Sequence, residues 1–266
     1  MKYAFIGLGH LGRYLAMSLR RAGFELAVTD LDRKAAEPLI AAGARWAATP
    51  KEAAAGADAV ITCLPSPAAS RAVVAGPDGV IEGLAHGGCW IEMSTNDRDE
   101  ILRLAAQLRE RGIETLEAPV TGGVHRAAEG EITVLAGGDE TLFAKHRAAL
   151  EAMGGKVIHM GPLGQAAIIK VITNMLAFIH LVACGEALML AKRGGLDLGK
   201  SFEAIRASSG NSFVHETEGQ LILNGSYDIG FTMALANKDL GFALGFGKAF
   251  DVPLELAGLT ERIFRK

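Results

Sequence analysis

A lysine and an asparagine stand one helical turn apart in the longest apolar stretch of the chain. Lys170 and Asn174 lie within residues 164–193, where most other side chains are aliphatic or small. Residues four positions apart share a face of a helix, so the amine and the amide are expected on the same side. That side either meets a polar cleft, where the amine could carry a proton, or lets the lysine reach solvent over an apolar stem. The spacing alone leaves both interpretations open.

The turn Thr121-Gly122-Gly123 is a second candidate for chemistry, and it follows an apolar strand pattern at 113–118. Successive backbone N–H groups in such a turn can form a concave site for a carboxylate, and the threonine hydroxyl adds a donor. The same residue types also make ordinary turns. The turn is therefore a candidate anion site.

A glycine motif near the N-terminus is the most specific of the three patterns. It follows the apolar run 2–6 and consists of Gly7, Leu8, Gly9, His10, Leu11 and Gly12. A strand that ends in G-x-G-x-x-G and continues as a helix is the pyrophosphate-binding fingerprint of dinucleotide folds. The alternative is a glycine-rich turn that binds nothing.

An acidic residue follows this motif at the expected distance. Residues 13–22 have the pattern of an amphipathic helix, and residues 24–29 have that of the next strand. Asp30 ends this strand, near the offset of ~20 residues at which a carboxylate binds the adenosine ribose. A 2′-phosphate would face this charge, so the pattern favours NAD, while the nearby Arg33 leaves NADP open.

The elements that must position these residues alternate between strand and helix over the first 160 residues. Further strands are predicted at 58–64, 88–93, 113–118, 131–136 and 156–159. Helical patterns lie between them, and this alternation predicts a mainly parallel, doubly wound sheet with ligands beyond the strand C-termini.

From Gly164 onward only helical patterns remain. We predict helices at about 164–193, 197–207, 212–223, 232–249 and 253–266. The expected fold is α/β, with a Rossmann domain at 1–162 followed by an all-helical domain at 163–266.

Composition argues against several partners. The net charge is −3 and there is no basic stripe, so nucleic acid is not expected. Cys63, Cys89 and Cys184 lie far apart, and neither C-x-x-C nor H-E-x-x-H occurs, so we expect no disulfide framework and no bound metal. This cysteine usage predicts a cytoplasmic protein.

The apolar stretch at 166–191 is long enough to span a bilayer at ~1.5 Å per residue. It is interrupted by Lys170, Asn174, His180 and Glu186. We therefore expect a buried helix of a globular domain and no membrane partner.

These motifs together resemble the β-hydroxyacid dehydrogenases, and among them the 3-hydroxyisobutyrate dehydrogenases. The resemblance rests on GLGHLG, the PVTGG turn, the G-x-x-G-x-x-x-x-x-K-x-x-x-N stretch that ends at Asn174, and the late Lys-Asp-Leu at 238–240. It covers nearly the whole chain in order and spacing. It implies NAD(P)-dependent oxidation of a small 3-hydroxy acid to its semialdehyde, or the reverse, by a homodimer or homotetramer.

The resemblance also implies residue roles. Lys170 would be the general acid and base. The substrate would be held by Thr121, Gly122, Gly123, Asn174 and Asp239. The cofactor would be bound by Gly7, Leu8, Gly9, His10, Leu11, Gly12, Asp30, Leu64, Pro65, Thr95 and Lys238.

Some residues depart from the family pattern. Thr121 stands where serine is usual, and Glu117 where aspartate is usual. His125 and Arg126 follow the turn at positions where small or neutral residues are expected.

Three alternatives remain. An S-adenosylmethionine-dependent methyltransferase can also pair a glycine-rich turn with an acid after the second strand, but that class does not explain the helical second half. An imine reductase-like enzyme shares the architecture but usually replaces the lysine, so Lys170 argues against it. A non-catalytic NAD(P)-binding regulatory protein would need the fold but not the set of Lys170, Asn174 and Thr121. The particular hydroxy acid is not identified by these residues.

Overall fold

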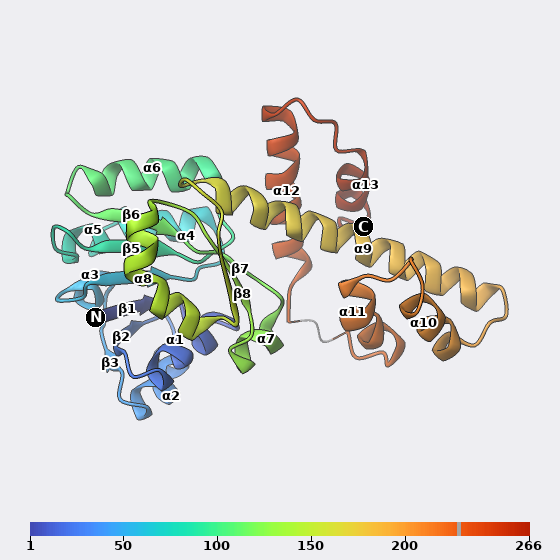
Figure 1. Ribbon diagram of the computed structural model, residues 1–266, viewed down its shortest axis with the longest axis horizontal. Helices are drawn as coiled ribbons and strands as arrows, with labels where there is room; N and C mark the ends of the chain where they lie inside the picture. The colour runs from blue at the N-terminus through green and yellow to red at the C-terminus, as the bar shows by residue number, and fades with distance from the viewer. Residues whose placement is uncertain (228–229) are drawn as a thin grey trace. The chain divides into compact units, whose positions relative to one another are not determined.

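The computed structural model describes residues 1–227 and 230–266 (Figure 1). The chain divides into two compact units, Met1–Lys170 and Val171–Lys266. This division falls after Lys170, and the domain boundary placed between 162 and 163 stays a prediction.

The first unit contains a six-stranded parallel sheet in the order β3-β2-β1-β4-β5-β6. Its strands are β1 (Lys2–Ile6), β2 (Glu25–Thr29), β3 (Arg45–Trp46), β4 (Ala59–Thr62), β5 (Cys89–Glu92) and β6 (Glu114–Glu117). The strand order reverses between β1 and β4, the position at which doubly wound sheets bind their ligands. The predicted fold class is confirmed.

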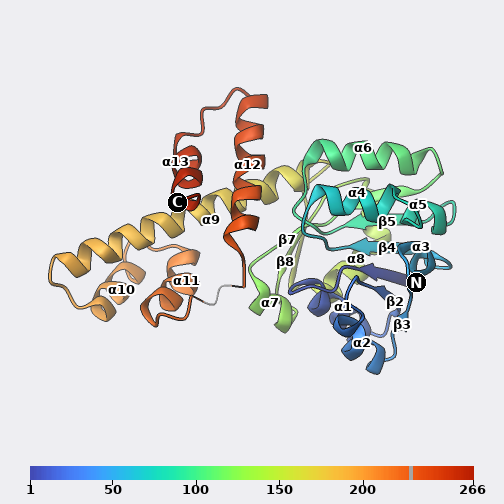
Figure 2. The same ribbon diagram turned by 180° about the vertical axis from the view of Figure 1, so that it is seen from behind.

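Helices cover both faces of this sheet (Figures 1 and 2). The helices of the first unit that precede α9 (Gln165–Arg193) are α1 (Gly12–Arg21), the 3₁₀ turn η1 (Arg33–Ala36), α2 (Glu37–Ala41), α3 (Pro50–Ala54), α4 (Pro67–Ala75), α5 (Val80–Gly83), α6 (Arg98–Arg109), α7 (Val124–Glu129) and α8 (Glu140–Met153). Alternate strand residues point to opposite faces, so Phe5 packs in one core cluster with Leu15 of α1, and Ile6 in another with Leu104 of α6.

A second, smaller sheet lies in the same unit. It has the order β7-β8-β9 and consists of β7 (Val120–Thr121), β8 (Thr133–Ala136) and β9 (Lys156–His159), with β7 antiparallel to β8. The prediction placed the later strands in one sheet with the others and did not include β3 or β7. Two-residue strands carry no periodic signal, and a strand pattern does not specify its partner.

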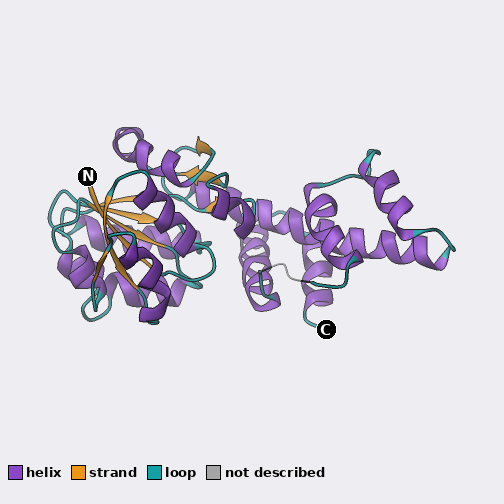
Figure 3. Cartoon of the chain, turned by 90° about the horizontal axis from the view of Figure 1, so that it is seen from below, coloured by secondary structure: helices purple, strands orange, loops and turns teal. Residues whose placement is uncertain are grey.

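The second unit is helical. Helix α9 (Gln165–Arg193) begins in the first unit, and it is followed by α10 (Leu198–Arg206), α11 (Phe213–Leu223), α12 (Met233–Ala249) and α13 (Glu255–Phe264). Every strand that the structure describes lies in the first unit (Figure 3). The five predicted helices are confirmed to within two residues at each end.

Helix α9 is long and apolar enough to cross a membrane by length and composition, with a mean hydropathy of 2.0 over its most apolar window. Core helices of globular proteins can have the same length and composition. Only 28% of that window is buried within the chain, so the expectation of a buried helix is wrong for a single chain. Its exposed apolar residues include Ile172, Leu176, Met189 and Leu190.

Candidate active site

The glycine turn between β1 and α1 has the shape of an anion cradle. Gly7 has φ +96°, and a Cβ on it would collide with the backbone carbonyl of Cys63, just beyond β4. A Cβ on Gly12 would collide with the carbonyl oxygen of Gly7, whereas one on Gly9 would meet nothing within 4 Å. The turn is therefore tightly packed at Gly7 and Gly12 and open at Gly9, and this arrangement fits a pyrophosphate at the start of α1.

Asp30 joins the end of β2 to this turn. Its Oδ2 accepts a 2.6 Å hydrogen bond from the N–H of Leu8, and its Oδ1 accepts one of 2.9 Å from the N–H of Asp32. Each carboxylate oxygen can accept more than one hydrogen bond, so the geometry still fits the ribose hydroxyls. The guanidinium carbon of Arg33 lies 5.8 Å from the ring centroid of Trp46, where cation–π attraction holds it.

Glu92, which the sequence analysis did not single out, organises the loops beyond β4 and β5. It is fully buried at the end of β5. Its Oε1 accepts hydrogen bonds from the Thr62 hydroxyl at 3.1 Å and the Ser94 N–H at 2.9 Å, and its Oε2 accepts one from Asn96 Nδ2 at 3.1 Å. The Ser94 hydroxyl also donates to Glu92 and accepts a 2.7 Å bond from the N–H of Leu64.

Glu92 therefore sets the conformation of the two loops that carry predicted cofactor residues. Leu64 and Pro65 follow β4, and Thr95 follows β5. A sequence signal existed, because an acidic residue inside the otherwise apolar strand 88–93 must find several donors when it is buried.

Glu117 is the second fully buried carboxylate, and it stands in register with Glu92 on the neighbouring strand β6. Its Oε1 accepts hydrogen bonds from the N–H groups of Gly164 at 2.6 Å and Ala166 at 2.9 Å, and its Oε2 accepts one from Ala167 at 3.0 Å. Burial raises the pKa of Glu117 to about 6, against the lowering effect of these three bonds, and the nearby Glu92 charge adds to the rise.

Lys170 lies on α9, three residues beyond the last of these amides. It belongs to the first unit, and its side chain is buried, with only 7% of the residue exposed. An amine held out of water on a helix of this unit is a candidate for proton transfer.

The Thr-Gly-Gly turn begins at Thr121, the last residue of β7, and its two glycines have an unusual backbone. Gly122 has φ +126° and Gly123 has φ +89°, conformations that residues with a Cβ rarely adopt. Two side chains of α7 lie over the turn: a Cβ on Gly122 would stand 3.2 Å from Arg126 Cδ, and one on Gly123 would stand 3.0 Å from His125 Cε1. Thr121 is half-buried.

Three further predicted residues meet in the second unit. Asn174 Nδ2 donates a 2.7 Å hydrogen bond to Asp239 Oδ2, and the Lys238 ammonium lies 2.7 Å from Asp239 Oδ1. Asp239 is almost fully buried, and the same ammonium stands 4.8 Å from the ring centroid of Phe242. The predicted site residues are thus grouped within each unit: the cradle, the turn and Lys170 in the first, and this trio in the second.

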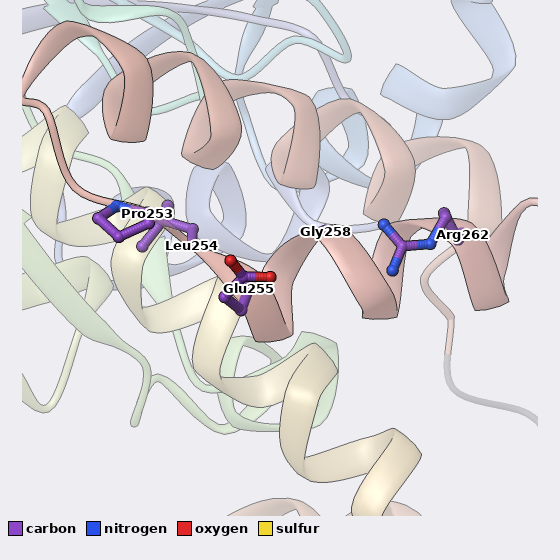
Figure 4. A pocket seen from close by; sticks show the side chains of 5 residues that line it. All are labelled: Pro253, Leu254, Glu255, Gly258 and Arg262. Carbon is purple, nitrogen blue, oxygen red and sulfur yellow. The ribbon is translucent and has the colours of Figure 1, made fainter.

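A surface hollow elsewhere in the second unit contains none of the predicted site residues (Figure 4). It lies at the start of α13 and is lined by Pro253, Leu254, Glu255, Gly258 and Arg262.

Comparison with known proteins agrees with this organisation. Residues 2–161 match the family model described as the NAD binding domain of 6-phosphogluconate dehydrogenase. Residues 164–266 match the model described as NAD-binding of NADP-dependent 3-hydroxyisobutyrate dehydrogenase.

Individual relatives align over almost the whole chain. It is 32% identical to 2-(hydroxymethyl)glutarate dehydrogenase of Eubacterium barkeri, covering 99% of this chain and 88% of that protein. It is 35% identical to the NAD-dependent L-serine dehydrogenase of Pseudomonas aeruginosa, covering 98% and 90%. The crystal structure of 3-hydroxyisobutyrate dehydrogenase from Salmonella typhimurium superposes with a TM-score of 0.91 at 32% identity, covering 100% of this chain and 93% of that one.

The parallel sheet, its glycine cradle and these matches define an NAD(P)-dependent oxidoreductase that acts on hydroxy acids. The chain belongs to the β-hydroxyacid dehydrogenase family, which includes the 3-hydroxyisobutyrate dehydrogenases.

Proposed function

We propose that the chain oxidises a small 3-hydroxy acid to its semialdehyde, or catalyses the reverse reaction, with Lys170 as the general acid and base. The observation that carries this proposal is the burial of the Lys170 amine on α9, in the same unit as the dinucleotide cradle. A lysine held away from water in a dehydrogenase fold is suited to proton transfer.

The residues divide the chemistry between them. NAD(P), when bound, supplies the redox step. The Lys170 amine takes the hydroxyl proton during oxidation, and its ammonium returns a proton to the carbonyl oxygen during reduction. The Thr121 hydroxyl and the amides of Gly122 and Gly123 hold the substrate carboxylate.

Asn174 and Asp239 complete the proposed substrate site. The hydrogen bond to Asp239 fixes the orientation of the Asn174 amide, and Asp239 is itself anchored by the Lys238 ammonium. Lys238 is proposed to contact the cofactor.

NAD is the proposed cofactor in preference to NADP. The Asp30 carboxylate lies beside the glycine turn, and Arg33 is held over Trp46. A 2′-phosphate would meet the negative charge of Asp30.

The proposed assembly is a homodimer or homotetramer in the cytoplasm. Ile172, Leu176 and Leu190 fall within about 40° of one another around α9 at ~100° per residue, and all three are exposed. An apolar stripe of this kind on a family dehydrogenase is suited to burial against a second copy of the chain.

A substrate panel tests the function. Small 3-hydroxy acids, including 3-hydroxyisobutyrate, L-serine and 2-(hydroxymethyl)glutarate, are each incubated with NAD or NADP, and reduced cofactor is followed by absorbance. Turnover of at least one acid supports the proposal. Reduction of cyclic imines without turnover of any hydroxy acid or semialdehyde would favour the imine reductase-like alternative.

A further inference from the structure

We propose that Glu117 is the positioning residue of Lys170: its buried carboxylate fixes where α9 begins and thereby where the amine stands. This inference rests on the role proposed for Lys170 above. Glu117 itself touches neither substrate nor cofactor in this account and acts only through the helix.

The contact is a three-point clamp on the start of the helix. The first N–H groups of an α-helix have no partners within it. Here those of Gly164, Ala166 and Ala167 all donate to the one carboxylate, at 2.6, 2.9 and 3.0 Å. A negative charge at this end is also favoured by the helix dipole. With a pKa of about 6, Glu117 is ionised at neutral pH, so both oxygens act only as acceptors.

The clamp is anchored to a rigid part of the sheet. Glu117 is the last residue of β6, and its backbone N–H and carbonyl pair with Gly137 at 2.9 and 2.8 Å. A Cβ on Gly137 would collide with Glu117 Oε1, so the carboxylate packs directly against that glycine. The head group is therefore confined on one side by backbone and on the other by the helix.

The connection from the clamp to the amine is short and stiff. Lys170 lies three residues beyond Ala167, about 4.5 Å along the helix axis at ~1.5 Å per residue. Neither glycine nor proline intervenes, and Ala166, Ala167 and Val171 are buried. A shift of the first turn is thus passed on to Lys170, and a misplacement of ~1 Å can cost a reaction about 100-fold.

The first experiment replaces Glu117 with glutamine. The Glu117→Gln side chain keeps the shape but turns an NH₂ group toward at least one helix N–H. We expect kcat to fall by about 10- to 100-fold. KM for the cofactor should stay unchanged, because the hydrogen bonds of Asp30 and the glycine turn do not involve Glu117. A wild-type kcat in this variant overturns the proposal.

A matched control is Glu92→Gln. It removes a buried carboxylate from the neighbouring strand in the same register, but the bonds of Glu92 go to the loops beyond β4 and β5. We expect this variant to raise KM for the cofactor more than it lowers kcat. An identical profile for the two variants would show a general loss of stability and overturn the positioning role.

A double-mutant cycle that combines Glu117→Gln with Lys170→Met shows whether the loss of kcat in Glu117→Gln acts through the Lys170 amine. In the Lys170→Met background, Glu117→Gln should cause no further loss of kcat. A second, independent loss would contradict positioning. If Lys170→Met itself keeps wild-type kcat, or if the wild type turns over no hydroxy acid, the proposed function fails, whatever the Glu117 variants do.

A rescue experiment leaves the carboxylate in place. Gly137→Ala should lower kcat because the new Cβ displaces the Glu117 head group, and adding Glu117→Asp should restore part of it because the shorter side chain relieves the collision. A double variant no more active than Gly137→Ala alone contradicts the clamp.

Amide hydrogen exchange on the wild-type protein tests the clamp without any substitution, so it remains available if the variants do not fold. The amides of Gly164, Ala166 and Ala167 should exchange more slowly than the first-turn amides of α13, whose N-cap residue Leu254 makes no side-chain capping bond. Equal rates at the two helix starts would overturn the clamp.

Discussion

Asp30 carries two tasks at the scale of a single residue. Its carboxylate orders the glycine turn through Leu8 and presents a negative charge to the ribose site. We expect the wild type to have a kcat/KM for NAD at least about tenfold above that for NADP, equivalent to ~1.4 kcal/mol. Asp30→Ala should lower the ratio of kcat/KM for NAD to kcat/KM for NADP. Steady-state kinetics with both cofactors measures this ratio, and a wild-type preference for NADP would refute the role of Asp30.

The buried side chain of His146 makes the free energy of unfolding depend on pH. It is fully buried on α8, its Nδ1 lies 3.1 Å from the Tyr3 hydroxyl, and its Nε2 has no hydrogen-bond partner among the described residues. Burial lowers the pKa of His146 to about 4, so the unfolded chain binds this proton more readily. Its contribution is complete above pH 6.5, the ordinary pKa, and is lost as the pH falls through about 4.

Between pH 6.5 and about 4, titration of His146 should lower the free energy of unfolding by about 3 kcal/mol. Denaturant unfolding of the wild type and of His146→Gln is measured at several pH values, and the difference between the two proteins gives the contribution of His146. The raised pKa of Glu117 changes the unfolding free energy in the opposite direction, but it does so equally in both proteins and cancels in the difference. Parallel pH profiles for the two proteins would contradict this prediction.

The motifs, but not the buried partners, could be found from the residues alone. Gly7, Gly9 and Gly12 are visible because their spacing is itself the signal. Glu117 lies in an apolar strand, and its hydrogen-bond donors Gly164, Ala166 and Ala167 come from the start of a helix that no local pattern connects to it. Long-range pairing of this kind is a property of the fold.

At the scale of elements, the helical half was predictable because its boundaries carry chemical signals. Asp197, Ser212 and Thr232 each cap a helix with the side chain, and each precedes an apolar periodic segment. The second sheet was not predictable, because β7 has only two residues and pairs with β8 in the antiparallel sense after the proline at 119.

At the scale of the whole molecule, the exposed stripe of α9 predicts association of the chain. Leu190 is 75% exposed on this stripe, and Leu190→Glu would place a charge in an apolar interface. We expect the wild type to sediment as a dimer or tetramer and Leu190→Glu to shift it toward monomer. Lys192→Glu, about 200° away around the helix, is the matched control and should leave the mass unchanged. A monomeric wild type would contradict the proposed assembly.

The most direct test of the central claim is the turnover of Lys170→Met with the substrate that the panel identifies. Methionine keeps an unbranched stem of similar length in the buried position but carries no proton. We expect kcat to fall by about 10²- to 10⁴-fold, the usual effect of losing a general acid and base. The Kd for reduced cofactor should be unchanged in the same preparation. A Lys170→Met variant that keeps wild-type kcat would contradict the catalytic role of this amine.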